Sequence, residues 1–328
     1  MASKSLQHIF QQAERILMSS TKVSLSLSEI RTEIRILINS SSTVFSSAAN
    51  STSSSPSFLL PLIPTATELE TAVMSESDYI ALMQLIHRRS NAEPISYLTG
   101  EQEFWSLPLY VNCDTLIPRP DTETLMESFL HFSKFKAVNA ATLPPPPPPP
   151  PPMVLDLYTG AGPLLVAALS ELEQAIGVGI DISPGAIDVA TRNAQRHQLM
   201  ERTTFLVEDL QHSQWHSSTA YDYIFANPPY IPSNDYLHLM PDVKDYEPHL
   251  ALVGGDSDGM ESYRLLALSF QEKRLRFAET NADAVLIMEV GQHQDQQVVE
   301  IFETMCGMRM REVRKDYGGI PRSVVMSL

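Results

Sequence analysis

The feature that most constrains the fold is a regular alternation of strand-like and helix-like segments between Met153 and Ala226. Short runs rich in branched and aromatic residues alternate with longer runs whose apolar residues recur every three or four positions. The strand-like runs are MVLDL, AIGVGID, TTFLVE and YDYIFA, and the helix-like runs are LLVAALSELEQ and PGAIDVATRNAQRHQL. Such alternation is typical of an open, mostly parallel α/β sheet. Further on, ADAVLIMEV predicts another buried strand, and the tail MRMREVRKDYGGIPRSVVMSL predicts a closing antiparallel hairpin.

A different pattern precedes this sheet. Residues 1–38 and 68–93 carry apolar residues at helical spacing, so we predict that they are helical. Residues 97–118 alternate well enough to predict a short β-hairpin. The predicted domains are therefore a small helical domain, a hairpin linker and an α/β domain, at residues 1–93, 94–118 and 119–328.

Two low-complexity segments interrupt these domains. The first is the serine-rich run SSSTVFSSAANSTSSSPS at residues 40–57, which has too few apolar residues to build a core and is predicted to be a flexible insertion. The second is the proline run Pro144–Pro152. Consecutive prolines form a polyproline helix of about 3 Å per residue, so this run is predicted to be a stiff spacer.

The bulk composition restricts the kind of ligand. The net charge is −16, and the sequence has no basic cluster of the kind that neutralises phosphates. The expected partner is therefore a small molecule or a basic protein, with no direct nucleic-acid binding. The two cysteines, Cys113 and Cys306, lie far apart, which favours neither a disulfide framework nor a zinc site. No apolar run reaches 18 residues, so we expect no membrane span.

A glycine-rich turn follows the first predicted strand of the sheet. The segment Asp156–Gly162 opens a helix at Pro163, and its glycines would let a ligand approach the backbone closely. Asp181 ends the next strand, where a carboxylate can accept hydrogen bonds from ribose hydroxyls. Asp209 ends the third strand and is a candidate acceptor for an adenine amino group. This pattern alone fits a dinucleotide, S-adenosylmethionine or a purely structural turn.

The tetrapeptide Asn227-Pro228-Pro229-Tyr230 follows the fourth predicted strand and indicates a particular chemistry. A planar amide or arylamine nitrogen is a poor nucleophile because its lone pair is delocalised. Two acceptors aimed at its two hydrogens would orient it and favour the positive charge that develops, with Asn227 Oδ1 as one and the Pro228 carbonyl as the other. The prolines restrict the backbone, and Tyr230 offers a flat face for stacking. The residues thus predict methyl transfer to such a nitrogen, with no metal required.

Segments on both sides of this tetrapeptide resemble the release factor glutamine methyltransferase family (HemK/PrmC). The tetrapeptide is shared with other amino-group methyltransferases, so the resemblance depends on the flanking segments. These are PISYLTGEQEFWSLPLYV (Pro94–Val111), LIPRPDTE (Leu116–Glu123), YEPHLALVGGDSDGMESYRLL (Tyr246–Leu266), LIMEVGQHQ (Leu286–Gln294) and KDYGGIPRSVV (Lys315–Val325). The resemblance covers nearly all of the chain apart from the two inserts, and these segments make it specific.

The resemblance implies a class I, Rossmann-like methyltransferase that uses S-adenosylmethionine. It also implies a helical front domain that docks a peptide chain release factor, whose Gly-Gly-Gln loop is methylated at the glutamine amide nitrogen. The implied cofactor-binding residues are Tyr158, Thr159, Gly160, Ala161, Gly162, Asp181, Asp209, Leu210 and Asn227. The implied substrate-binding residues are Asn227, Pro228, Pro229 and Tyr230, of which Asn227, Pro228 and Tyr230 are the implied catalytic residues.

One position departs from the family's pattern, because the first glycine of the usual DLGTGSG is Tyr158 here. Either the side chain sits in a strained backbone and crowds the cofactor, or the turn tolerates it. Since Gly160, Gly162, Asp181 and Asn227 are all present, we expect it to be tolerated. On this expectation Tyr158→Gly changes cofactor affinity at most a few-fold and costs roughly 1 kcal/mol of stability through unfolded-chain entropy.

Two other functions remain open from the sequence. One is methylation of an adenine or guanine amino group in nucleic acid, because a flipped base presents a similar planar nitrogen. The other is an inactive methyltransferase fold that serves as a binding scaffold, which Tyr158 would favour. For the compartment, the serine-rich and proline-rich inserts are typical of eukaryotic chains, and full-length eukaryotic members of the family resemble the organellar enzymes. We therefore predict a mitochondrial location, with the cytoplasm as the alternative.

Overall fold

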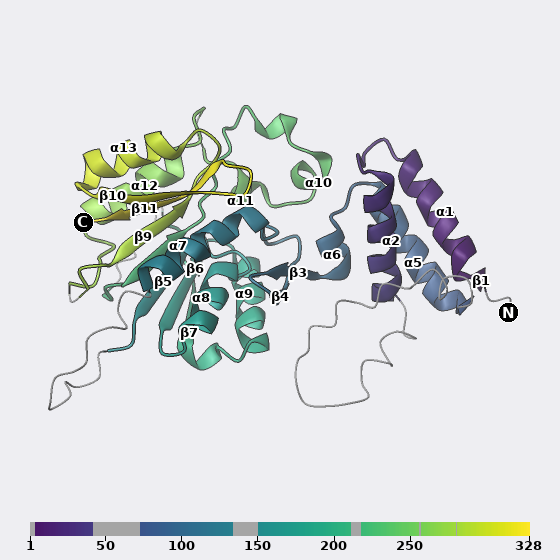
Figure 1. The fold of residues 1–328 in the computed structure, drawn as a ribbon, viewed down its shortest axis with the longest axis horizontal. Helices are drawn as coiled ribbons and strands as arrows, with labels where there is room; N and C mark the ends of the chain where they lie inside the picture. Colours follow the sequence, from purple (N-terminus) through teal and green to yellow (C-terminus); the bar gives the residue numbers. More distant parts are fainter. Residues whose placement is uncertain (1–3, 42–72, 134–149, 211–217, 256, 280) are drawn as a thin grey trace. The chain divides into compact units, whose positions relative to one another are not determined.

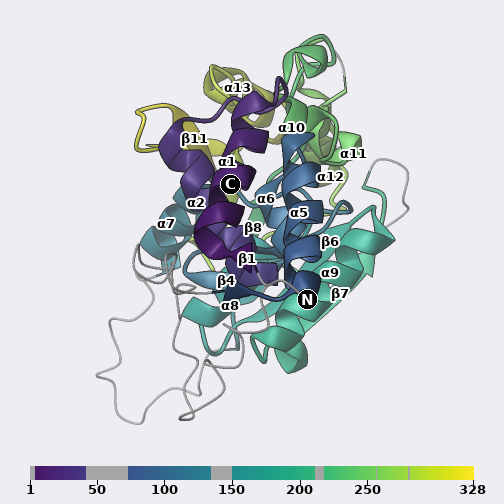
Figure 2. The ribbon, with the colours of Figure 1, turned by 90° about the vertical axis from the view of Figure 1, so that its right-hand side faces the viewer.

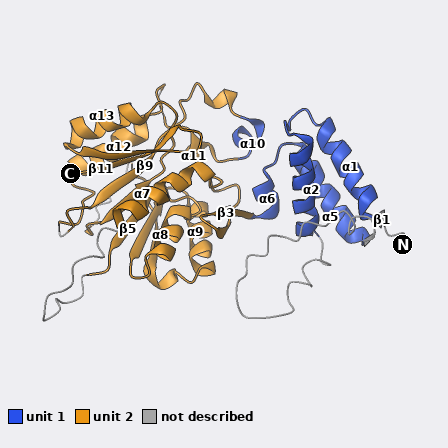
Figure 3. Cartoon of the chain, in the orientation of Figure 1, with its two compact units in different colours: residues 1–100, 240–246 blue, residues 101–239, 247–328 orange. Residues whose placement is uncertain are grey.

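The computed structural model divides the chain into two compact units (Figure 3). Unit 1 contains residues 1–100 and 240–246, and unit 2 contains residues 101–239 and 247–328. The structure describes all residues except 1–3, 42–72, 134–149, 211–217, 256 and 280. The first two serines of the serine-rich run end a helix. Residues 42–57 of this run and the first six prolines of the proline run fall outside the described residues, so their predicted character stays a prediction.

Within its described residues, unit 1 is built on three helices, which pack side by side (Figure 2). They are α1 (Leu6–Ser19), α2 (Leu27–Ser41) and α5 (Glu76–Ser90). The helical segment predicted for residues 1–38 is therefore divided in two, because residues 20–26 leave the helical conformation at a serine- and threonine-containing stretch. The shorter elements of unit 1 are β1 (Lys4–Ser5), β2 (Val73–Met74), α6 (Ile95–Thr99) and α10 (Pro241–Lys244).

Local sequence explains where α5 begins and why the bundle holds. The Ser75 side chain accepts a hydrogen bond from the Asp78 backbone N–H at 3.1 Å, which caps the helix. Acidic residues occupy its first turn and basic residues its last, in the order that the helix dipole favours. The buried core of the three helices is Leu6, Ile9, Phe10, Ala13, Leu17, Ile30, Ile34, Leu37, Ile38, Leu82 and Ile86.

Unit 2 contains a mixed sheet, which within the described residues has the strand order β10-β11-β9-β8-β5-β6-β7 (Figure 1). The strands are β5 (Met153–Leu157), β6 (Ile176–Asp181), β7 (Thr203–Val207), β8 (Tyr223–Ala226), β9 (Val285–Glu289), β10 (Arg309–Lys315) and β11 (Pro321–Ser327). Strands β5 to β9 run parallel, whereas β11 pairs antiparallel with both β9 and β10. The predicted parallel sheet and its closing hairpin are confirmed, and the order is that of a class I methyltransferase.

Helices cover both faces of this sheet (Figure 1). One face packs against α7 (Glu123–Ser133), α8 (Pro163–Glu171) and α9 (Pro184–Arg196), and the other against α12 (Glu261–Gln271) and α13 (Asp295–Cys306). Strand β8 illustrates the arrangement, because Tyr223 and Phe225 enter the first core whereas Ile224 and Ala226 enter the second. Such a strand, buried on both faces, reads as a continuous apolar run.

The remaining elements of unit 2 lie, along the chain, before and between the strands and helices of this sheet. The predicted hairpin is confirmed as β3 (Glu101–Phe104) and β4 (Leu107–Tyr110), an antiparallel pair. The described part of the unit also contains the short helical turns η1 (Pro120–Thr122), η3 (Met200–Arg202), η4 (Tyr236–His238) and α11 (His249–Leu252). Among the described helices, none is both long and apolar enough to cross a bilayer.

Candidate functional site

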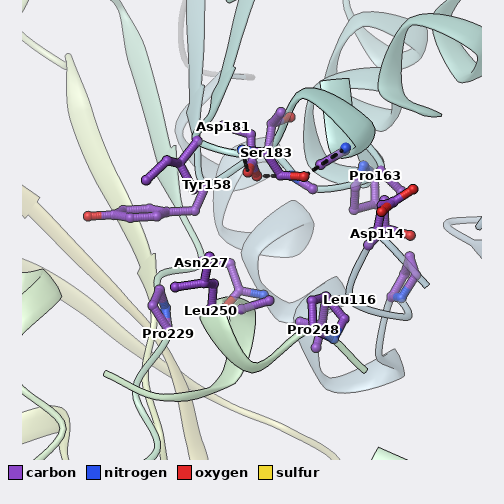
Figure 4. Close-up of a pocket in the computed structure, with 18 of the residues that line it drawn as sticks. Asp114, Leu116, Tyr158, Pro163, Asp181, Ser183, Asn227, Pro229, Pro248 and Leu250 are labelled. Carbon is purple, nitrogen blue, oxygen red and sulfur yellow. Dashed lines mark hydrogen bonds between the residues drawn. The ribbon is translucent and has the colours of Figure 1, made fainter. Parts of the chain in front are cut away.

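A cavity of about 280 Å³ lies at the carboxyl ends of the parallel strands of unit 2 (Figure 4). Ligands bind at this edge of such sheets because the strand ends and the loops after them converge there. The figure shows Tyr158 and Asn227 across the cavity from Asp114 and Pro163. Of the residues predicted to form the site, the cavity lining includes Tyr158, Thr159, Gly160, Ala161, Asp181, Asn227 and Pro229.

The glycine-rich turn between β5 and α8 forms one wall of the cavity. The Thr159 backbone N–H donates to the Ile180 carbonyl at 2.9 Å, which ties the turn to the neighbouring strand β6. Gly160 has φ 53°, and a Cβ built on it would meet no atom within 4 Å. Gly160 therefore satisfies a left-handed backbone and leaves its cavity side open.

Gly162 serves a different purpose from the one predicted. It does not line the cavity, and a Cβ at this position would lie 3.3 Å from the Ala190 Cβ of α9. Its φ of 79° is also in the left-handed region. Gly162 thus starts α8 and allows α8 and α9 to pack closely, so the expectation that it opens the backbone to a ligand is not supported by its position.

Tyr158 adopts the left-handed conformation, with φ 59°. The expectation of an unstrained backbone at this position is therefore wrong. A left-handed residue that has a Cβ costs roughly 1–2 kcal/mol, because the Cβ approaches the following carbonyl. The side chain compensates, since it packs against the buried cluster of unit 2 and lines two adjoining cavities. Burial raises the pKa of the Tyr158 hydroxyl, and nearby Asp209 and Asp181 raise it further, so the phenol stays neutral.

A pair of substitutions separates backbone strain from ring packing at Tyr158. Both Tyr158→Gly and Tyr158→Ala remove the ring, but glycine alone relieves the left-handed strain. We expect the glycine variant to be more stable than the alanine variant by about 1 kcal/mol. Chemical denaturation of the two variants measures the difference. In an ordinary backbone the order would be reversed, because glycine then carries the larger entropy cost.

Asp181 is held with its carboxylate facing the cavity. Its Oδ2 accepts from the Gly160 backbone N–H at 2.8 Å, and its Oδ1 accepts from the Ser183 backbone N–H at 2.9 Å. Burial raises the pKa of this carboxyl, and the two backbone donors act against that rise. Each oxygen retains a lone pair, so the carboxylate is oriented to accept further hydrogen bonds from ligand hydroxyls.

Asp156 is the first residue of the glycine-rich turn, and the sequence pattern predicted no role for its side chain. Its side chain is 1% exposed and lies in the cavity lining. Thr159 Oγ1 donates to Oδ2 at 2.6 Å, whereas Oδ1 has no hydrogen-bond partner among the described residues. Burial raises the pKa of Asp156 to about 7. The Thr159 hydroxyl and the nearby Leu165 amide oppose this rise, but the amide does not form a hydrogen bond with Oδ1.

The unpaired Oδ1 of Asp156 indicates whether S-adenosylmethionine fits the cavity. A buried acceptor without a partner is costly unless a ligand satisfies it. The cofactor carries a sulfonium and an α-ammonium group, and both complement an unpaired carboxylate oxygen. The Asp181 carboxylate lines the same cavity, where it offers hydrogen-bond acceptors of the kind that ribose hydroxyls require. The residues present therefore fit this cofactor.

The turn after β8 presents Asn227 to the cavity. Its side chain is half-buried in the lining, and it forms no hydrogen bond with any residue that the structure describes. Pro229 also lines the cavity, while Pro228 is buried beside it. A polar side chain that is positioned but unpaired at a strand end is available to a ligand.

Tyr230 is placed away from the cavity lining. Its hydroxyl donates to Glu289 Oε1 at 3.1 Å, and its carbonyl accepts from Gln294 Nε2 at 3.0 Å. Burial raises the pKa of the Tyr230 hydroxyl well above its ordinary value, and Glu289 reinforces the effect. Stacking of the Tyr230 ring on an acceptor group stays a prediction, whereas its bond to Glu289 was not anticipated.

Asp209 and Leu210 lie apart from the main cavity. They line a second, smaller cavity of about 90 Å³, which shares Tyr158, Asp181 and Pro229 with the first. The ring of Tyr158 therefore borders both. The predicted cofactor residues thus fall into two adjoining groups rather than one continuous wall.

Sequence reasoning also missed Asn193, a fully buried residue of α9. Its Nδ2 donates to the Ala161 carbonyl at 2.8 Å and to the Tyr110 carbonyl at 3.0 Å, and its Oδ1 accepts from the Tyr110 N–H at 2.7 Å. One side chain therefore joins the glycine-rich turn to the end of the β3–β4 hairpin. An asparagine inside an amphipathic helix was the available signal, but its partners lie more than 30 residues away in sequence.

Comparison with known proteins gives a consistent result. Residues 153–249 match the family model described as a methyltransferase domain. A release factor glutamine methyltransferase of Rhodospirillum rubrum is 38% identical over 270 residues, which cover 81% of this chain and 75% of that protein. One of Bradyrhizobium diazoefficiens is 34% identical over 252 residues, covering 77% and 78%. One of Geobacter sulfurreducens is 36% identical over 255 residues, covering 76% and 79%.

Proposed function

Because this chain belongs to the release factor glutamine methyltransferase family, we propose that it methylates the glutamine amide nitrogen in the Gly-Gly-Gln loop of a peptide chain release factor. Its cofactor is S-adenosylmethionine. When bound, this cofactor supplies an electrophilic methyl group on a sulfonium centre. In this proposal, Asp156 and Asp181 would hold it, because both side chains line the cavity.

The observation that carries the proposal is the unpaired Asn227 side chain in the cavity wall. A glutamine amide nitrogen is a weak nucleophile, because its lone pair is shared with the carbonyl. Asn227 Oδ1 accepts one amide hydrogen and the Pro228 carbonyl accepts the other. Both acceptors stabilise the positive charge that develops on the nitrogen, and they do so without reorganising at the moment of reaction.

The chain also contributes to methyl transfer by orienting the acceptor amide relative to the cofactor. Two consecutive prolines limit the backbone torsions of the turn, so little freedom is lost when the substrate binds. Pro229 lines the same cavity as Asp181 and Gly160. This shared lining supports the proposal that acceptor and cofactor bind in one space. Holding two reactants in this way accounts for a large part of the rate in transfer reactions.

The choice of a protein acceptor over nucleic acid rests on the family and on charge. The chain carries a net charge of −16 and so would repel a phosphate backbone rather than release its counterions. The loop of a release factor presents a single flexible glutamine to the cavity. Nucleic-acid methylation is the alternative outcome of the test below. A mitochondrial location stays a prediction, as does the cytoplasmic alternative.

The test is transfer of a labelled methyl group to three acceptors offered separately. They are a release factor that contains the Gly-Gly-Gln loop, the same factor with asparagine in place of the loop glutamine, and a mixture of tRNA and duplex DNA. We expect label on the first acceptor and none on the other two. Label on nucleic acid alone would contradict the proposal, and so would equal label on the asparagine variant.

A further inference from the structure

Glu289 is a buried acid directly beside the acceptor turn. It is the last residue of β9, and its side chain is 2% exposed. Strand β9 pairs in parallel with β8, with Met288 opposite Ala226. The residue that follows each member of this pair is Glu289 on one strand and Asn227 on the other. The buried carboxylate is therefore level with the start of the catalytic turn.

The two carboxylate oxygens of Glu289 bind different parts of the site. Oε1 accepts from the Tyr230 hydroxyl at 3.1 Å, and Oε2 accepts from Thr122 Oγ1 at 2.6 Å. Thr122 lines the cavity, and Tyr230 directly follows the cavity-lining Pro229. One buried group thus connects the wall formed by η1 to the turn that carries Asn227.

Burying the Glu289 carboxylate costs free energy that an apolar side chain of the same size would not cost. Removing a carboxylate from water is unfavourable unless donors and positive charge compensate. Here the compensation is two hydroxyl donors and the guanidinium of Arg322, while Asp121 lies near enough to oppose ionisation. A neutral apolar side chain would fill the same space at a lower cost, so the carboxylate has a role in connecting its two donors.

The backbone of Tyr230 is held independently of this carboxylate. Gln294 donates to its carbonyl, and Gly259 packs so closely that a Cβ there would lie 2.2 Å from the same oxygen. Gly254 likewise packs against the Pro229 carbonyl. If the Tyr230 hydroxyl is removed, the turn therefore stays folded. Its orientation relative to Thr122 is then no longer fixed by the Glu289 carboxylate.

We propose that Glu289 is a positioning residue for methyl transfer, which holds the Asn227–Tyr230 turn through the Tyr230 hydroxyl and aligns it with the Thr122 wall of the cavity. The inference rests on the proposed acceptor role of Asn227. Glu289 itself touches neither substrate nor cofactor. Its effect is on the geometry of the two amide-accepting oxygens, so it acts on the turnover number rather than on cofactor binding.

The experiment is a double-mutant cycle on Glu289→Gln and Tyr230→Phe. We expect each single variant to lower kcat about tenfold, and the double variant to lose no more than the worse single one. The Kd for S-adenosylmethionine, measured by calorimetry, should stay within about twofold. Multiplicative losses in the double variant, or normal kcat in the folded single variants, would overturn the proposal.

Three further variants keep the test decisive. Thr122→Val removes the second donor and should also lower kcat, which provides a measurement if Glu289→Gln does not fold. Tyr263→Phe is the matched control, because its hydroxyl bonds the Glu289 main-chain oxygen at 2.8 Å rather than the carboxylate. It should change the melting temperature but not kcat. If the natural protein transfers no methyl group to the release factor, the proposed function fails. If Asn227→Ala retains activity, the acceptor role of Asn227 fails, and if it loses activity while the cycle shows no coupling, only the role of Glu289 fails.

Discussion

Replacing Asn227 by alanine is expected to lower kcat about 100-fold, which corresponds to a loss of roughly 3 kcal/mol of transition-state stabilisation. The half-buried amide forms no hydrogen bond with the described residues, so its removal leaves no protein group without a partner. Stability should therefore change little. The acceptor amide loses one of two oxygens that orient its hydrogens, and the developing positive charge loses the same partner.

Rapid-quench measurement of methyl transfer, together with thermal denaturation and calorimetric titration of S-adenosylmethionine, checks each part of this result. Asn227→Asp is the matched variant, because it keeps an oxygen acceptor at nearly the same place. It should retain more activity than the alanine variant and less than the natural protein. An alanine variant that is folded, binds cofactor and transfers methyl at a near-normal rate would remove Asn227 from the mechanism.

Replacing Asp156 by asparagine is expected to have opposite effects on stability and on cofactor binding. Burial raises the pKa of Asp156 from 3.8 to about 7 in the folded chain. Between these values the folded state binds the proton more tightly than the unfolded state, so stability falls as pH rises through this window. Asparagine does not ionise. The variant should match the natural protein near pH 4 and exceed its stability above pH 7, by on the order of 2 kcal/mol.

Cofactor binding should change in the other direction. A cationic ligand gains from the ionised carboxylate, so the affinity of the natural protein for S-adenosylmethionine should rise as pH increases from about 5.5 to 7. Asp156→Asn should bind about 30-fold more weakly at pH 7, since a hydrogen bond to a charged group is lost. The pKa of Asp181 is also raised, so Asp181 also contributes to the pH dependence of cofactor affinity. The difference in this dependence between the natural protein and Asp156→Asn is the part due to Asp156. Titration calorimetry at several pH values, with denaturation at the same pH, tests both claims. Equal affinity of the two proteins across this range would contradict the assignment.

Local patterns were sufficient to predict the sheet and the position of the acceptor turn. Strand β8 is continuous in apolar residues because both of its faces are covered, and its run ends at the residue before Asn227. In a parallel sheet such a position must lie at the ligand-binding edge. Helices α7, α12 and α13 were not predicted from the sequence, although their apolar residues form much of both cores.

By itself, the sequence determined that this protein has a parallel α/β sheet, a glycine-rich turn after β5 and the Asn227–Tyr230 turn after β8. These features depend on residue type and on spacing within a single segment, so periodicity reveals them. Tertiary structure decided the left-handed backbone of Tyr158, the orphaned oxygen of Asp156 and the connection through Glu289. Glu289 bonds Thr122, which is 167 positions away in the chain. Burial and hydrogen bonding across such separations arise when the chain packs, and no local pattern encodes them.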